Sequence, residues 1–178
     1  SDLASMPNKI DRVLDTMDGV RELARELKDA GSVLFLGRHV GFPVALEGAL
    51  KLKELAYMHA EGFAAGELKH GPIALIEDDL PVICVMPSPQ GRSLLHEKMV
   101  SNLQEIRARG AFTIVIAEEG DDAVEPYADR VISVPAVPTL MQPLVTTVPL
   151  QVFACELATA KGHDVDQPRN LAKSVTVE

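Results

Sequence analysis

The segment Ser32–Ala64 decides the fold, and it reads SVLFLGRHVGFPVALEGALKLKELAYMHAEGFA. It begins with a short apolar run, Ser32–Leu36, that is typical of a buried strand. A turn containing two glycines follows, and residues 43–59 then have the periodicity of a helix. A weaker strand pattern lies near Ala60–Ala64. A strand followed by a helix and a second strand predicts a parallel strand pair joined by a crossover helix.

The rest of the chain repeats this alternation of strands and helices. Three further apolar runs predict strands: Pro81–Met86 (PVICVM), Phe112–Ala117 (FTIVIA) and Arg130–Val134 (RVISV). Helical patterns cover 91–110 and 139–161, and residues 7–30 predict two more helices. Strands that are apolar throughout are typical of parallel sheets covered on both faces. We therefore predict one three-layer α/β/α sandwich with a parallel sheet of about five strands.

Composition narrows the class of protein and of partner. A chain of 178 residues is long enough for one domain with a real core. The net charge of −9 argues against nucleic acid or an anionic membrane as a partner. Cys84 and Cys155 lie in apolar runs and form no disulfide framework, which favours a cytoplasmic location. The histidines lack the spacing of metal ligands, so we expect no metal ion and no other cofactor. No apolar run reaches the ~18 residues of a membrane span.

The predicted helix at 43–59 carries an unusual stripe of charge. At about 100° per residue, Glu47, Lys51, Glu54 and Met58 fall on one narrow face. The remaining faces are almost entirely apolar, which is normal for a buried helix. Buried charge is costly unless it is paired or used, so the three charged residues would share a partly enclosed site. The alternative is a solvated ion pair between residues four apart on the helix surface.

The turn after the first strand is a second candidate for binding. In open α/β sheets, ligands bind beyond the carboxyl ends of the strands. The run Gly37-Arg38-His39-Val40-Gly41 lies there, and it brings the amino end of the predicted helix to that edge. The run has neither the P-loop nor the GxGxxG spacing. Its two glycines could equally serve only the change from strand to helix.

Two more polar segments contain side chains suited to catalysis. Gly66–Pro72 is a turn bounded by glycines, and the imidazole of His70 suits proton transfer at neutral pH unless it is simply solvated. The final segment, HDVDQPRNLAKSVTVE (163–178), has no helical or strand period. Lys173 lies there among apolar neighbours. Desolvation in such a setting can lower the pKa of a lysine, so that the neutral amine acts as a nucleophile. The segment could also be a frayed terminus.

Three of these segments together resemble one enzyme family. EGALKLKE, AAGELKHGP and DVDQPRNLAKSVTVE are similar to the glutamine–fructose-6-phosphate aminotransferases (isomerizing), and the resemblance runs over nearly the whole chain. Members of that family have a glutaminase domain followed by two sugar isomerase (SIS) subdomains. This chain resembles the second subdomain. The resemblance implies a helical lead-in at 1–30, a flavodoxin-like SIS domain at 31–162 and an active-site tail at 163–178.

The resemblance also implies a reaction and partners. Ammonia from glutamine would replace the C2 oxygen of fructose 6-phosphate, and a ketose-to-aldose proton shift would give glucosamine 6-phosphate. The implied partners are the phosphosugar, the glutaminase and first SIS domains of a parent chain, and a second subunit in a homodimer. Nucleic acid and membrane are not expected.

The site residues carry over by motif. Glu54 corresponds to the family's acid/base, which moves the proton between C1 and C2. Lys51 and Glu47 correspond to its neighbours, which help position and polarise the sugar hydroxyls. His70 would open the sugar ring from the partner subunit. Lys173 would form an imine with the open-chain sugar, and Ala172 beside it belongs with Glu47 and Lys173 to the substrate-binding group. For this chemistry the tail would fold over the carboxyl edge of the sheet. A proton shift of this kind needs one carboxylate that both accepts and returns a proton.

The sequence also departs from the family pattern. It begins Ser1-Asp2, without the glutaminase nucleophile, and it lacks the Ser/Thr-rich phosphate loop of the first SIS subdomain. We therefore expect the chain alone to be inactive in the full reaction. A stand-alone SIS phosphosugar-binding regulatory module is one alternative, and a simple phosphosugar isomerase is another. A regulator needs no proton shuttle, and a simple isomerase needs its own phosphate loop.

Overall fold

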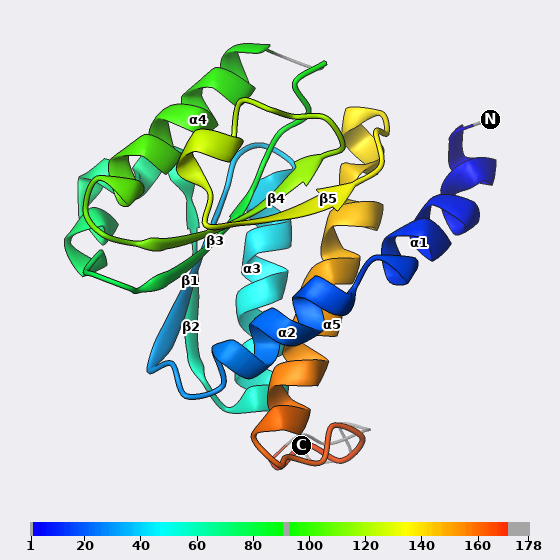
Figure 1. Cartoon of the computed structure of the whole chain (residues 1–178), viewed down its shortest axis with the longest axis vertical. Helices are drawn as coiled ribbons and strands as arrows, with labels where there is room; N and C mark the ends of the chain where they lie inside the picture. The colour runs from blue at the N-terminus through cyan, green and yellow to red at the C-terminus, as the bar shows by residue number, and fades with distance from the viewer. Residues whose placement is uncertain (1, 91–92, 171–178) are drawn as a thin grey trace, which may run out of the picture.

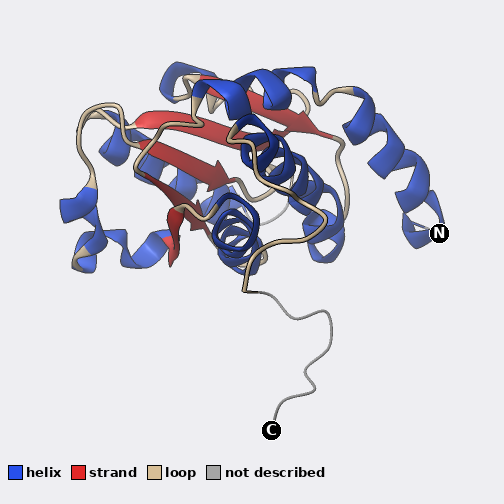
Figure 2. Cartoon of the chain, turned by 90° about the horizontal axis from the view of Figure 1, so that it is seen from below, coloured by secondary structure: helices blue, strands red, loops and turns tan. Residues whose placement is uncertain are grey.

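The computed structural model, which describes residues 2–90 and 93–170, has a five-stranded parallel sheet between two layers of helices (Figures 1 and 2). The strand order is β2-β1-β3-β4-β5, the flavodoxin-like order with a switch point between β1 and β3. The predicted three-layer sandwich is confirmed. The strands are β1 Ser32–Gly37, β2 His59–Ala64, β3 Pro81–Val85, β4 Phe112–Glu118 and β5 Arg130–Val134.

Each face of the sheet has its own apolar core. Successive side chains of a strand point to opposite faces, so Phe35 joins one core and Leu36 the other. Four helices contribute to the first core: α1 Met6–Asp15, α2 Asp18–Glu26, α3 Gly41–Lys51 and α5 Gln142–Ala160. The second face is covered by α4 Ser93–Arg107 and by the short 3-10 helices Ala65–His70, Pro72–Leu75 and Glu125–Tyr127.

Helix α5 is the central helix of the first layer. It packs against α1, α2 and α3, and Leu150, Phe153 and Leu157 are buried. By length and composition alone, Thr139–Ala160 could cross a membrane, since a window of 18 residues within it has a mean hydropathy of 1.2. Its packing against three helices accounts for that apolar character, because a helix covered on several sides needs few polar residues.

The predicted helix at 43–59 ends earlier than its sequence pattern suggested. After α3 the chain makes a π-helical turn, Leu52–Ala56, and Tyr57 then adopts the left-handed conformation with φ 53°. Strand β2 begins two residues later, at His59. Met58 therefore leaves the charged stripe and is buried in the core, at 5% exposure. The other predicted elements differ from the structure only at their ends.

Close packing of α3 on the sheet depends on Gly48. A Cβ atom at this position would lie 2.7 Å from Phe35 Cε1 and 2.9 Å from Leu150 Cδ1. At Gly19, in α2, a Cβ atom would meet nothing within 4 Å. Of these two helical glycines, Gly48 is therefore the one that its surroundings require.

We expect Gly48→Ala to lower the free energy of unfolding by about 1–3 kcal/mol, because the overpacked core must shift. The matched control, Gly19→Ala, should be neutral or stabilise by up to about 1 kcal/mol, because alanine favours helices. Urea unfolding of both variants measures the difference. Equal stability of the two would show that α3 does not pack on the sheet as described.

Candidate active site

Glu47, Lys51 and Glu54 form a charge cluster on α3 and the π-helical turn. Lys51 Nζ lies 2.5 Å from Glu54 Oε2 and 3.5 Å from Glu47 Oε1. The side chains of Lys51 and Glu54 are 26% and 27% exposed, and that of Glu47 is 38% exposed. The structure thus brings together the three charged residues of the predicted stripe, in a partly enclosed setting.

The cluster keeps Lys51 in its charged form. The hydrogen bond to Glu54 raises the pKa of Lys51 above its ordinary value of 10.5, partial burial opposes the shift, and the charge of Glu47 adds to it. At neutral pH this side chain is therefore an ammonium group. It can donate hydrogen bonds and polarise an oxygen, but it is a poor amine nucleophile.

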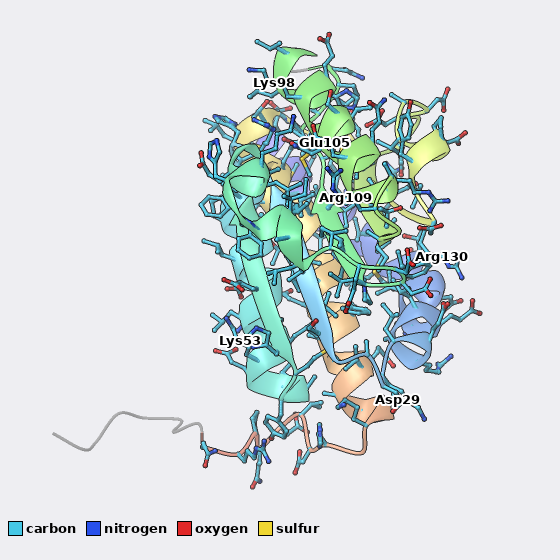
Figure 3. All side chains as sticks on the ribbon, turned by 90° about the vertical axis from the view of Figure 1, so that its left-hand side faces the viewer. Asp29, Lys53, Lys98, Glu105, Arg109 and Arg130 are labelled. Carbon is cyan, nitrogen blue, oxygen red and sulfur yellow. The ribbon has the colours of Figure 1, made fainter. Side chains whose placement is uncertain are left out.

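The charge cluster lies near the amino ends of the strands. Helix α3 begins at the carboxyl edge of the sheet, as the sequence predicts, and runs from there toward the opposite edge. From Gly41 to Glu54 a helix advances about 20 Å. The π-helical turn leads into His59, which pairs with Ser32, the first residue of β1. In Figure 3, Lys53 of this turn and Asp29 lie toward the end of the molecule that holds the chain's tail, and Lys98 of α4 lies at the other end.

The turn after β1 serves the fold. A Cβ atom on Gly37 would lie 2.1 Å from the carbonyl oxygen of Gly41, so a side chain cannot be accommodated there. Arg38 points toward α4, where its guanidinium donates to Asn102 Oδ1 at 3.1 and 3.2 Å. Of the two roles left open for these glycines, the structure supports the tight turn between strand and helix.

The described part of the tail packs against Tyr57. The backbone N–H of Arg169 donates to the Tyr57 hydroxyl at 2.8 Å, and the guanidinium carbon of Arg169 lies 4.1 Å from the centroid of the tyrosine ring. The ring of His163 contacts the same tyrosine, with 4.6 Å between centroids. We had expected the tail to fold over the carboxyl edge of the sheet. Residues 163–170 lie instead at the amino edge, and Ala172 and Lys173 fall outside the described residues.

Sequence reasoning missed the contribution of Tyr57. In a regular helix this residue would only flank the charged stripe, and no local pattern links it to residues more than a hundred positions later. The π-helical turn and the left-handed backbone at Tyr57 give its ring the position it has.

His70 lies apart from the charge cluster within this chain. It ends the 3-10 helix Ala65–His70, which belongs to the second core, whereas α3 belongs to the first. Its Nδ1 lies 2.7 Å from Glu67 Oε2, and both side chains are exposed. Within one chain, His70 and Glu54 therefore do not belong to the same site.

Helix α3 is less buried than its apolar composition suggested. Leu46 is 45% exposed and Leu50 is 41% exposed, and both lie on the helix that carries Glu47 and Lys51. The described part of the chain therefore covers the apolar faces of α3 only in part. An apolar surface accompanies the charge cluster.

Comparisons with known proteins agree with the observed fold. The model of the SIS domain family matches residues 26–161. The chain is 77% identical over 177 residues to the glutamine–fructose-6-phosphate aminotransferase (isomerizing) of Streptomyces coelicolor, and 72% identical over 178 residues to that of Corynebacterium diphtheriae. These matches cover 99% of this chain but only 29% and 28% of the relatives.

A solved structure gives a similar result. The C-terminal domain of glucosamine-fructose-6-phosphate aminotransferase from Francisella tularensis superposes with a TM-score of 0.83 and is 37% identical. The match covers 93% of this chain and 45% of that one. The chain thus corresponds to the carboxyl-terminal isomerase part of these larger enzymes.

We expect Glu54→Gln to lower the pKa of Lys51, because partial burial would remain after the strongest opposing interaction is lost. The wild-type stability gained from this pair should be complete below pH 10.5 and should fall as the pH rises through the higher folded pKa. Side-chain NMR titration of Lys51 measures the shift. Glu61→Gln, an exposed change in β2, is the control, and identical titrations of both variants would contradict the expectation.

Proposed function

This chain belongs to the SIS domain family, and we propose that it supplies the acid/base half of the isomerase site of a glutamine–fructose-6-phosphate aminotransferase. The observation that supports this most is the contact of Glu54 with Lys51, in a chain so similar to those enzymes. The proposed product of the parent enzyme is glucosamine 6-phosphate, an amino sugar precursor, made in the cytoplasm. A regulatory phosphosugar sensor has no use for such a carboxylate, so it is the less favoured alternative.

In the proposed chemistry, the tail forms the imine and the charge cluster moves the proton and binds the sugar. The amine of Lys173 adds to C2 of the open-chain sugar and water leaves, which gives an imine. Ammonia then replaces the lysine at C2. Glu54 takes a proton from C1 and returns it to C2, so one carboxylate acts first as base and then as acid. Glu47 and Lys51 hold the sugar hydroxyls, and Ala172 lies beside the imine-forming residue.

The state of Lys51 supports the assignment of the imine to Lys173. An ammonium group must lose its proton before it can attack a carbonyl, and Lys51 is stabilised in its charged form by two carboxylates. Lys51 is therefore suited to polarising an oxygen of the sugar. The tail lysine is the remaining amine among the residues of the proposed site.

The proposed site is completed by other chains or domains. We assign His70 to the site of a second subunit, because it lies on the opposite face from Glu54 within one chain. The exposed Leu46 and Leu50 suit a contact with the first SIS domain of the parent enzyme. Ammonia and most of the phosphate binding would come from the glutaminase and first SIS domains.

In the parent enzyme, borohydride reduction in the presence of fructose 6-phosphate should attach one sugar to Lys173, located by peptide mapping. Lys173→Arg keeps the charge but cannot form the imine, so we expect no adduct and a loss of at least about 100-fold in activity. Lys53→Arg is the matched control because Lys53 is exposed on the π-helical turn. An adduct on Lys51, or normal activity of Lys173→Arg, would refute the assignment.

Mixed dimers of the parent enzyme test whether subunits share sites. Glu54→Gln and His70→Ala homodimers should each lose most activity. In a heterodimer of the two, one site retains both wild-type residues, so roughly a quarter to a half of the activity should return. Mass spectrometry confirms that the heterodimers formed. If they formed and activity stayed at the level of the parents, His70 would not act across a subunit interface.

A further inference from the structure

We infer that Tyr57 is a positioning residue that clamps residues 163–169 of the carboxyl-terminal tail beside the turn that carries Glu54, at the amino edge of the sheet. The clamp consists of Tyr57, His163 and Arg169. The inference rests on the proposed role of Lys173, but the contacts that carry it lie among the described residues. It assigns a task to Tyr57 that no sequence motif indicated.

Three contacts converge on this tyrosine. Its hydroxyl accepts the backbone N–H of Arg169 at 2.8 Å, its ring face lies 4.1 Å from the Arg169 guanidinium carbon, and its ring contacts His163 with 4.6 Å between centroids. A hydrogen bond, a cation–π contact and an aromatic pair each stabilise an arrangement modestly, and together they fix it in both position and direction.

The tail has internal order that supports the clamp. Asp164 Oδ1 accepts the backbone N–H groups of Asp166 and Gln167, at 2.9 and 3.2 Å, which forms a turn between the two ends of the clamp. Val165 packs against the first apolar core. The chain between His163 and Arg169 is thus held by hydrogen bonds within the tail and by packing on the first core, as well as by Tyr57.

The position of Tyr57 gives the clamp its functional meaning. It follows Glu54 by three residues, and its left-handed backbone ends the π-helical turn that carries Glu54. Lys173 follows Arg169 by four residues, so the covalent chain limits their Cα atoms to about 14 Å apart. Anchoring Arg169 next to the acid/base turn therefore limits how far Lys173 can lie from Glu54, and such a limit would raise the effective concentration of its amine there.

The test compares the two tyrosines of the chain, of which Tyr127 lies with the second core. In the parent enzyme, Tyr57→Ala should speed tryptic cleavage after Arg169 about tenfold and slow formation of the Lys173 adduct about tenfold. The KM for glutamine should not change. Tyr57→Phe keeps the ring and should show a smaller effect in the same direction, and Tyr127→Phe should show none.

The other possible outcomes test separately whether Tyr57 anchors the tail and whether the anchored tail positions Lys173. Unchanged cleavage and adduct rates in Tyr57→Ala overturn the clamp, and faster cleavage with an unchanged adduct rate shows that the anchored tail does not position the lysine. If Tyr57→Ala unfolds, the comparison of Tyr57→Phe with Tyr127→Phe decides instead. If the unaltered enzyme forms no Lys173 adduct, the proposed function fails, and the cleavage rates still decide whether Tyr57 anchors the tail.

Discussion

The chain must leave α3 and enter β2 within the few residues between Glu54 and His59, and this constraint shapes the site. His59 pairs with Ser32, so the register of β2 on β1 determines where the helix has to stop. A π-helical turn and a left-handed residue, Tyr57, meet that requirement. π-helical turns are rare and occur often at functional sites. Here the turn carries the candidate acid/base and supports the tail.

Electrostatics explains why the cluster is stable in a half-exposed position. One ammonium group, on Lys51, interacts with two carboxylates, so the like charges of Glu47 and Glu54 are separated by a cation. Water weakens such interactions, whereas an environment of lower dielectric constant strengthens them. The exposed Leu46 and Leu50 on the same helix provide apolar surface against which another domain could exclude water.

Sequence patterns predicted the sheet and the charged stripe for the same reason, which is that both depend on local periodicity. Strands such as Phe112–Ala117 are apolar on both faces, a pattern that parallel sheets require. Residues three and four apart on a helix meet, so Lys51 was bound to lie near Glu47 and Glu54. The same reasoning misplaced Met58, because periodicity assumes a regular helix and cannot anticipate a π-helical turn.

What the sequence by itself determined is the order of the elements, the layered architecture and the charge cluster, since these follow from spacing along one strand or helix. Only the tertiary structure decided which edge of the sheet the cluster occupies and which residues reach it. The separation of His70 from Glu54 depends on which face each segment covers. The contact of Tyr57 with Arg169 joins positions 112 residues apart, and such a contact arises from packing that local patterns do not encode.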